Sequence, residues 1–341
     1  MLRLARESRE LTQAQLAERL GVRQSKVSKM EAGLLPVSHN EVLALAQILD
    51  YGDALFYWQD KVYGYASHEM FHRRRQRAGV RTLARIHAQL NIREMQLDRL
   101  LRGAELDSTH DFAHFDPDEF DGDVERIAAS VRAAWKLPRG PIVNVVESIE
   151  GAGGIIIPHD FQTIHVDAVS QWLPHLPPVF FVNTRAPVDR LRLTLCHEVG
   201  HVVMHRTLVP EAEEEAMRFA AEFLMPADDI GHQLYDISLP QLADLKMYWK
   251  VSMAALLVRA RTLGTISDRQ YRRFWMRMSQ LGFNKKEPVD LAAEEPRTFR
   301  DLLKVHRTEL EYSLEDLARL TAENHIPEIL DDRRGRLTVV A

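Results

Sequence analysis

Two histidines four residues apart, His197 and His201, enclose Glu198 in the sequence HEVGH. If this segment is a helix, both imidazoles project from one face, one turn apart, and can bind one Zn²⁺ ion. Glu198 then lies beside the metal, where it can take a proton from bound water. Because the chain has 15 histidines, such a short string can arise by chance. The flanking sequence must therefore decide whether it is a metal site.

A second apolar helical pattern follows the motif and offers a third ligand. Its buried stripe consists of Ala216, Phe219, Ala220 and Phe223. Glu213 precedes Ala216 by three residues and Ala220 by seven, so it falls on the same face. A carboxylate directed inward needs a cation, and two histidines with one glutamate form a known catalytic zinc arrangement. Glu214 and Glu215 remain competing ligands at this stage.

His205 lies four residues beyond His201, but helix geometry argues against it as a ligand. His197 and His205 would be about 12 Å apart on a straight helix, too far for one ion with bonds of about 2.1 Å. We expect His205 at the C-terminus of the helix, where an imidazolium interacts favourably with the helix dipole. We expect Cys196 to be a small buried side chain.

Composition narrows the class of protein. A chain of 341 residues suggests two to three domains, and its net charge of −5 gives no general attraction to nucleic acid. The single cysteine excludes an intramolecular disulfide and fits a reducing compartment. Neither a signal-peptide-like apolar run after Met1 nor an apolar span of 18 residues is present. We therefore expect a cytoplasmic protein that does not associate with membranes.

The first 50 residues are predicted to form three short helices. Thr12 is a suitable N-cap for the first, and Gly21 ends its pattern. A second helix fits 23–32 and ends at Gly33, and Asn40 is predicted to cap a third that reaches Leu49. Residues 1–35 hold seven Lys or Arg and four Asp or Glu, a local balance of +3. This local basic balance is compatible with binding to nucleic acid.

Beyond residue 66 the pattern suggests a connector and then a mixed domain. A basic run, 73–77, precedes a long amphipathic helix with apolar positions from Leu83 to Leu101. The basic stretch 73–85 either extends phosphate contact or forms a solvated linker face. The acidic segment 105–123 is predicted to be a linker or surface loop. The predicted strands are Gly154–Ile157 and Val179–Val182, and the predicted helices are 125–136, one from near Asp189, 212–224, 238–248, 252–262, 267–280, 298–306 and 313–323.

The segments PVDRLRLTLCHEVGHVVMH and EEEAMRFAAEFLMP resemble the ImmA/IrrE family of metallopeptidases. The resemblance covers roughly 125–280 and implies a gluzincin-like core of helices around a small sheet. It also implies His197, His201 and Glu213 as zinc ligands and Glu198 as the general base. The chain departs from the family at Met217, where Asn or Asp is usual and can support a metal-binding histidine.

Residues 3–49 resemble the XRE-type helix-turn-helix domains. That resemblance implies that the second helix of the pair enters the major groove of DNA with its N-terminal side chains against base edges. The candidates for DNA contact are Gln13, Gln24, Ser25 and Lys29. Dimerisation is expected, because one unit of this size makes few base contacts.

We therefore predict a mainly α protein with a small β-sheet (α+β), in which an all-α helix-turn-helix domain precedes a gluzincin-like peptidase domain. The expected boundaries are 1–66 for the DNA-binding domain, 67–124 for the connector and linker, 125–284 for the peptidase domain and 285–341 for a C-terminal helical extension. The resemblance implies a DNA-binding transcriptional regulator with a zinc-dependent endopeptidase domain that cleaves a repressor or other regulatory protein. The alternative is a non-proteolytic regulator or the antitoxin of a toxin–antitoxin pair. Expected partners are an operator in double-stranded DNA, a protein substrate or toxin, and a second copy of the chain.

Overall fold

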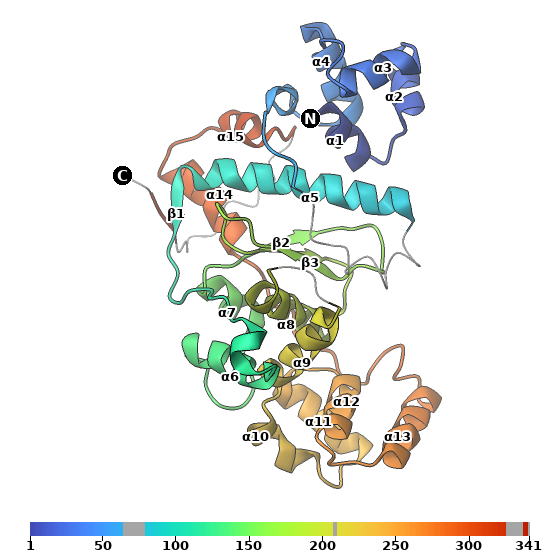
Figure 1. The fold of residues 1–341 in the computed structure, drawn as a ribbon, viewed down its shortest axis with the longest axis vertical. Coiled ribbons are helices and arrows are strands. Elements are labelled where there is room, and N and C mark those ends of the chain that lie inside the picture. The colour runs from blue at the N-terminus through green and yellow to red at the C-terminus, as the bar shows by residue number, and fades with distance from the viewer. Residues whose placement is uncertain (64–78, 207–209, 325–336, 340–341) are drawn as a thin grey trace. The chain divides into compact units, whose positions relative to one another are not determined.

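The computed structural model describes residues 1–63, 79–206, 210–324 and 337–339 (Figure 1). Its contacts divide the chain into two units, each with its own hydrophobic core. Unit 1 comprises Met1–Asp107 with Arg297–Ala341, and unit 2 comprises Ser108–Pro296. The basic run 73–77 lies outside the described residues, so neither reading of it is settled.

Unit 1 begins with four short helices. They are α1 (Leu2–Ser8), α2 (Gln13–Leu20), α3 (Gln24–Glu31) and α4 (His39–Leu49), followed by a 3₁₀ turn at Asp53–Tyr57. Thr12 caps α2 as predicted, in a capping box with Gln15. The predicted cap at Asn40 is wrong. Ser38 caps α4 in a capping box with Glu41, so the helix begins earlier and Asn40 lies inside its first turn.

The rest of unit 1 is built on the long helix α5 (Val80–Leu101). Its buried residues Ala88, Ile92 and Met95 belong to the same core as the N-terminal helices. The remaining elements are α14 (Thr298–Thr308), α15 (Leu314–Thr321) and an antiparallel pair of short strands, β1 (Ala104–Leu106) and β5 (Leu337–Val339).

The segment 285–341, expected as one C-terminal extension, is divided between the two units. Within unit 2, Glu287 accepts hydrogen bonds from the Met253 and Ala254 N–H groups, at 2.9 and 3.2 Å. Within unit 1, the Thr321 carbonyl oxygen accepts a 2.7 Å hydrogen bond from Gln96, and the Ala322 carbonyl oxygen accepts one of 2.8 Å from the Gly52 N–H. Specific polar contacts therefore assign each part of the segment to a unit.

Unit 2 contains a three-stranded sheet with the order β2-β4-β3. The two predicted strands are present as β2 (Ile155–His159) and β4 (Val179–Asn183), which pair in parallel. The third strand, β3 (Ala168–Gln171), pairs antiparallel with β4 and was not predicted, because its four residues are too few for a clear alternation. It forms one edge of the sheet, with Ser170 opposite Phe180.

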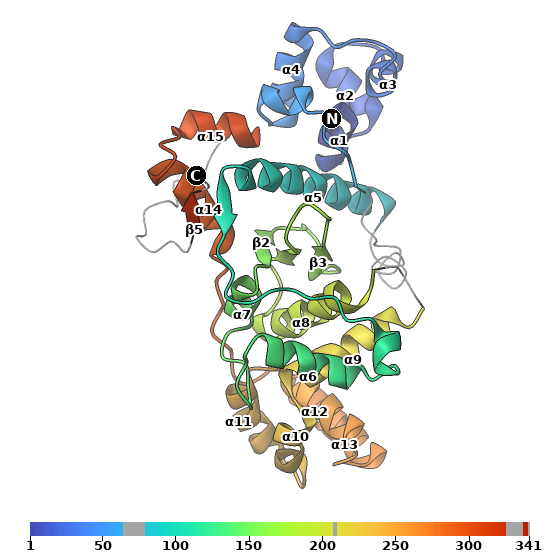
Figure 2. The ribbon, with the colours of Figure 1, turned by 60° about the vertical axis from the view of Figure 1, so that its left-hand side comes forward.

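Helices cover the sheet in layers, from the sheet through α8 to α9 and α6 (Figures 1 and 2). The helices of unit 2 are α6 (Val124–Ala134), α7 (Val145–Gly151), α8 (Val188–Met204), α9 (Ala212–Leu224), α10 (Ala227–Ile230), α11 (Leu239–Trp249), α12 (Met253–Thr262) and α13 (Asp268–Gln280). A Cβ atom at Gly200 of α8 would lie 3.2 Å from the Ala216 Cα atom of α9. The glycine therefore allows α8 and α9 to pack closely.

Most of the acidic segment 105–123, predicted as a linker or surface loop, belongs to unit 2. Phe112, Phe115 and Phe120 pack against its core. The Thr109 N–H donates to the Gly151 carbonyl oxygen at 2.9 Å, and the Phe115 N–H donates to the Val203 carbonyl oxygen at 2.7 Å. The phenylalanines anchor the part of this segment that follows β1, which is irregular apart from a 3₁₀ turn at Pro117–Phe120.

The predicted fold class, mainly α with a small β-sheet, is confirmed. Among the described residues, no helix is both long and apolar enough to span a bilayer.

Candidate metal centre and nucleic-acid interface

The two histidines of the HEVGH sequence lie one turn apart on α8, with their rings turned toward each other. The Nε2 atoms of His197 and His201 are 3.0 Å apart, and the ring centroids are 4.6 Å apart. His197 is buried and His201 is half-buried. Two histidines that bind one metal ion must direct one ring nitrogen each at the same point, and these two side chains do so.

Glu213 approaches the histidines from α9. Its carboxylate oxygens lie 3.7 Å from the His197 Nε2 atom and 3.5 Å from the His201 Nε2 atom. The potential ligand atoms of these three residues all lie within 4.8 Å of one another. Bonds from zinc to nitrogen or oxygen are about 2.0–2.2 Å long, so tetrahedral ligand atoms lie about 3.4 Å apart. The donor set therefore fits a zinc ion with its fourth position open.

The competing glutamates of α9 point elsewhere. Glu214 is exposed, and Glu215 lies 3.0 Å from the His205 Nε2 atom. The structure thus brings together His197, His201 and Glu213, the three residues singled out from the sequence. His205 caps the C-terminus of α8 as expected. The expected imidazolium is not supported, because burial lowers the pKa of the His205 ring.

Glu198, the predicted base, is buried beside the edge strand of the sheet. Its Oε2 atom accepts hydrogen bonds from the Ser170 N–H at 3.1 Å and from the Ser170 hydroxyl at 2.7 Å. Both donors come from β3. The general-base candidate is therefore held by a residue of the strand that the sequence analysis missed.

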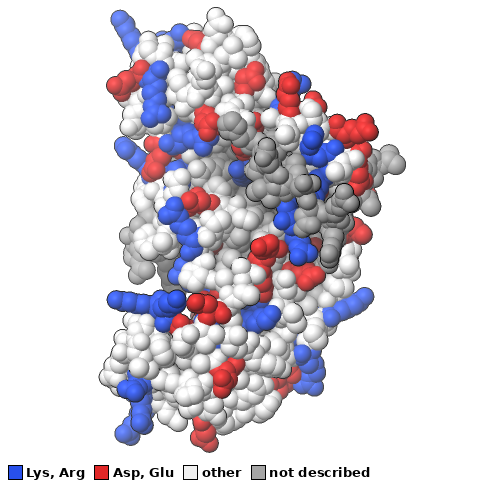
Figure 3. All heavy atoms as spheres, turned by 180° about the vertical axis from the view of Figure 1, so that it is seen from behind, with Lys and Arg blue, Asp and Glu red and all other residues white. Residues whose placement is uncertain are grey.

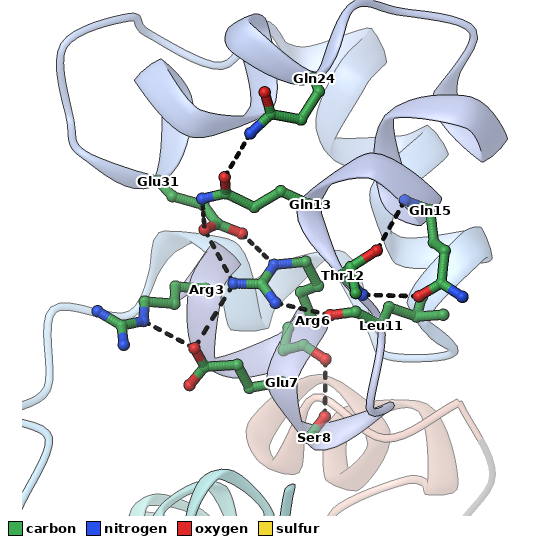
Figure 4. Close-up of polar contacts among 11 residues, drawn as sticks. Arg3, Arg6, Glu7, Ser8, Leu11, Thr12, Gln13, Gln15, Gln24 and Glu31 are labelled. Carbon is green, nitrogen blue, oxygen red and sulfur yellow. Dashed lines mark hydrogen bonds and ion pairs between the residues drawn. The ribbon is translucent and has the colours of Figure 1, made fainter. Parts of the chain in front are cut away.

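In unit 1, the predicted DNA-contact residues lie on the pair formed by α2 and α3. The Gln24 side-chain amide donates to the Gln13 side-chain oxygen at 2.7 Å, and Gln13 donates to Glu31 at 2.8 Å (Figure 4). Glu31 also accepts two hydrogen bonds from Arg6, at 2.5 and 3.0 Å. These hydrogen bonds position the N-termini of α2 and α3. The other two predicted contact residues, Ser25 and Lys29, are exposed on α3.

The described residues form no broad basic patch on the face of the protein shown in Figure 3. Lysine and arginine side chains are interspersed there with aspartate and glutamate. This agrees with the net charge of −5. An interface with nucleic acid must therefore depend on local contacts from particular side chains.

Two family models match the chain. Residues 150–261, which include α8 and α9, match the IrrE N-terminal-like domain of peptidase family M78. Residues 1–56 match a helix-turn-helix domain. The chain combines a helix-turn-helix domain with an IrrE N-terminal-like domain. This confirms both resemblances inferred from the sequence. Comparison with curated proteins finds no significant match.

Cys196 precedes His197 on α8, and Met217 lies on α9. Cys196 is fully buried, as predicted, and burial raises the pKa of its thiol to about 12. A protonated thiol is a poor metal ligand, so Cys196 acts as a small core residue. Met217 is 47% exposed and has no carboxylate or amide with which to support a histidine ligand.

Sequence reasoning missed two polar contacts of the IrrE N-terminal-like domain. Ser170 was overlooked because its strand was not recognised. The pair formed by His205 and Glu215 was overlooked because His205 was considered as a ligand or a helix cap and Glu215 only as a ligand. The spacing of four residues between His201 and His205 is the one sequence signal that would have suggested a side-by-side contact.

Proposed function

We propose that this protein is a DNA-binding transcriptional regulator whose IrrE N-terminal-like domain is a zinc-dependent endopeptidase. Its substrate would be a repressor or other regulatory protein. The observation that supports this best is the convergence of His197, His201 and Glu213 within 4.8 Å, with Glu198 next to His197 on the same helix. The helix-turn-helix domain in the same chain links the reaction to gene regulation.

His197, His201 and Glu213 would hold the zinc ion. When bound, zinc polarises a peptide carbonyl group and lowers the pKa of water. The Glu198 carboxylate takes the proton from the attacking water and then delivers it to the leaving amine nitrogen. The Ser170 N–H and hydroxyl orient this carboxylate from the edge of the sheet.

The edge position of β3 favours an extended protein segment as substrate. In the order β2-β4-β3, only one side of β3 pairs with a described strand. The Ser170 N–H donates to Glu198 of α8, so the other side of this strand faces the helix that carries His197 and His201. A peptide that adds as a further strand would be held by main-chain hydrogen bonds, with its scissile bond near the metal.

The peptidase proposal predicts that cleavage depends on zinc. Metal-free chain, prepared with a chelator, is added to an extract of the source cells with or without one equivalent of zinc. Mass spectrometry of labelled amino termini should detect new termini in a small set of proteins only in the zinc-loaded sample. The same extract with zinc but no added chain is the control. Identical termini in all samples would contradict the proposal.

The helix-turn-helix domain is proposed to bind double-stranded DNA as a homodimer, with α3 in the major groove of each half-site. Gln13 and Gln24 would act together, since their side chains are hydrogen-bonded. Ser25 and Lys29 would contact DNA directly from the exposed side of α3.

Lys29→Ala is expected to weaken specific DNA binding by about 1–3 kcal/mol, because it removes one charged contact. The probe is a duplex selected from a random pool on the wild-type chain, and binding is measured at several salt concentrations. Lys285→Ala, which removes an exposed lysine outside the helix-turn-helix domain, is the matched control. Equal affinity of Lys29→Ala and the control would remove Lys29 from the interface.

A non-proteolytic regulator, or an antitoxin that uses the fold to bind its partner, is the second candidate. The helix-turn-helix domain favours it, because DNA binding can regulate genes without cleavage of a protein. This function would be preferred if the chain bound both zinc and DNA but released no new amino termini.

A further inference from the structure

His205 occupies a position between a candidate metal ligand and a carboxylate. Its Nδ1 atom lies 3.0 Å from the Nδ1 atom of His201, and its Nε2 atom lies 3.0 Å from the Oε2 atom of Glu215. The side chains of His205 and Glu215 are only 5% and 18% exposed. These three side chains therefore form a largely buried row from α8 to α9.

The donors and acceptors of these three side chains determine which ring nitrogens carry a proton. A carboxylate only accepts hydrogen bonds, so the His205 Nε2 atom must donate to Glu215. In a neutral His205 ring, the Nδ1 atom then has a lone pair and accepts from the Nδ1–H group of His201. The remaining nitrogen of His201, Nε2, is left with its lone pair. That atom is the one that faces His197 and Glu213.

We propose that Glu215 and His205 are positioning residues that hold His201 in the tautomer and orientation required to bind the metal. This inference rests on the metal site of the proposed function. Partners of this kind are common around metal-binding histidines, because they fix the ring and raise its basicity. Here the carboxylate acts through an intervening imidazole.

The row provides a hydrogen-bonded support for His201 that Met217 cannot provide. Met217 cannot support a histidine by hydrogen bonding and is 47% exposed. Glu215 lies two residues earlier on α9 and reaches the second histidine of the motif through His205. Support for the metal site would therefore come from a different position of the same helix.

The first test requires no substitution. Long-range ¹⁵N–¹H correlation spectra of the metal-free, ¹⁵N-histidine-labelled chain report the tautomer of each ring, with His201 and His205 assigned by substitution. We expect His201 protonated on Nδ1 and His205 protonated on Nε2. The opposite tautomer at either ring would overturn the proposal. Because this readout needs neither metal nor cleavage, it remains informative if the proposed peptidase function fails.

The second test measures zinc affinity by competition with a chromophoric chelator. Glu215→Ala should bind zinc roughly 10- to 100-fold more weakly than the wild-type chain. Glu215→Gln keeps an oxygen that accepts from His205 and should bind more tightly than Glu215→Ala. Glu214→Ala, an exposed neighbour, is the matched control and should match the wild type.

The visible spectrum of bound Co²⁺ should change in Glu215→Ala and remain unchanged in Glu214→Ala, because the spectrum reports the geometry of the ligands. Circular dichroism of the metal-free variants verifies that they are folded. Wild-type zinc affinity and an unchanged Co²⁺ spectrum in Glu215→Ala would overturn the proposal. Absence of zinc binding by the wild-type chain would instead refute the metal site itself.

Discussion

Glu198→Gln is expected to lower the rate of peptide hydrolysis by roughly 10²- to 10⁴-fold, the usual contribution of a general acid–base residue. Glutamine has nearly the same size as glutamate, and its oxygen can still accept from Ser170. It cannot take a proton from the attacking water. Zinc affinity should be unchanged, because Glu198 is not among the three residues that converge to form the site.

The measurement is the initial rate of cleavage of a peptide that spans a site found by amino-terminal profiling. Zinc content is determined on the same samples. Glu214→Gln removes an exposed carboxylate from α9 and should cleave at the wild-type rate. A Glu198→Gln rate equal to that of the control would exclude Glu198 as the base.

Most helices were predictable because their signals are local. Thr12 and Gly21 mark the two ends of α2 through a capping box and a left-handed glycine, with φ of 69°. The two strands that were predicted are short runs of apolar residues. The strand β3 lacks such a run, since it depends on pairing with β4, a contact that is not local in sequence.

The other differences have one local and one tertiary cause. Capping of α4 by Ser38 instead of Asn40 follows from a local capping box, in which the Ser38 N–H donates to the Glu41 carboxylate at 2.8 Å, and this signal was overlooked in the sequence SHNE. The division of 285–341 between two units follows from hydrogen bonds to distant residues, such as that between Gln96 and the Thr321 carbonyl oxygen. Contacts of this kind leave little trace in the sequence.

The residues that converge at the candidate metal centre could be named from the sequence. Helical spacing placed His197 and His201 together, the apolar stripe left Glu213, Glu214 and Glu215 as candidates, and the family resemblance implied Glu213, which the structure brings to the histidines. The supporting contacts of Ser170 and Glu215 were not predictable. They depend on how β3 and α9 pack against α8, whereas the spacing of His197 and His201 is set within α8 alone.

Glu213→Ala is expected to lower zinc affinity by more than the roughly 10- to 100-fold that is typical of residues supporting a ligand. It removes a carboxylate whose oxygens lie 3.7 and 3.5 Å from the two histidine Nε2 atoms. Two imidazoles alone would then hold the ion, without the negative charge that stabilises it. Glu213 is half-buried at the start of α9, so the variant should remain folded.

His197, His201 and Glu213 are proposed to bind one metal ion. The decisive measurement is a titration of the metal-free chain with zinc, in competition with a chromophoric chelator. We predict one zinc per chain for the wild type and for the matched control Glu214→Ala, and greatly weakened binding for Glu213→Ala. Equal zinc affinity in Glu213→Ala and the wild type, or no zinc binding by the wild type, would contradict the claim.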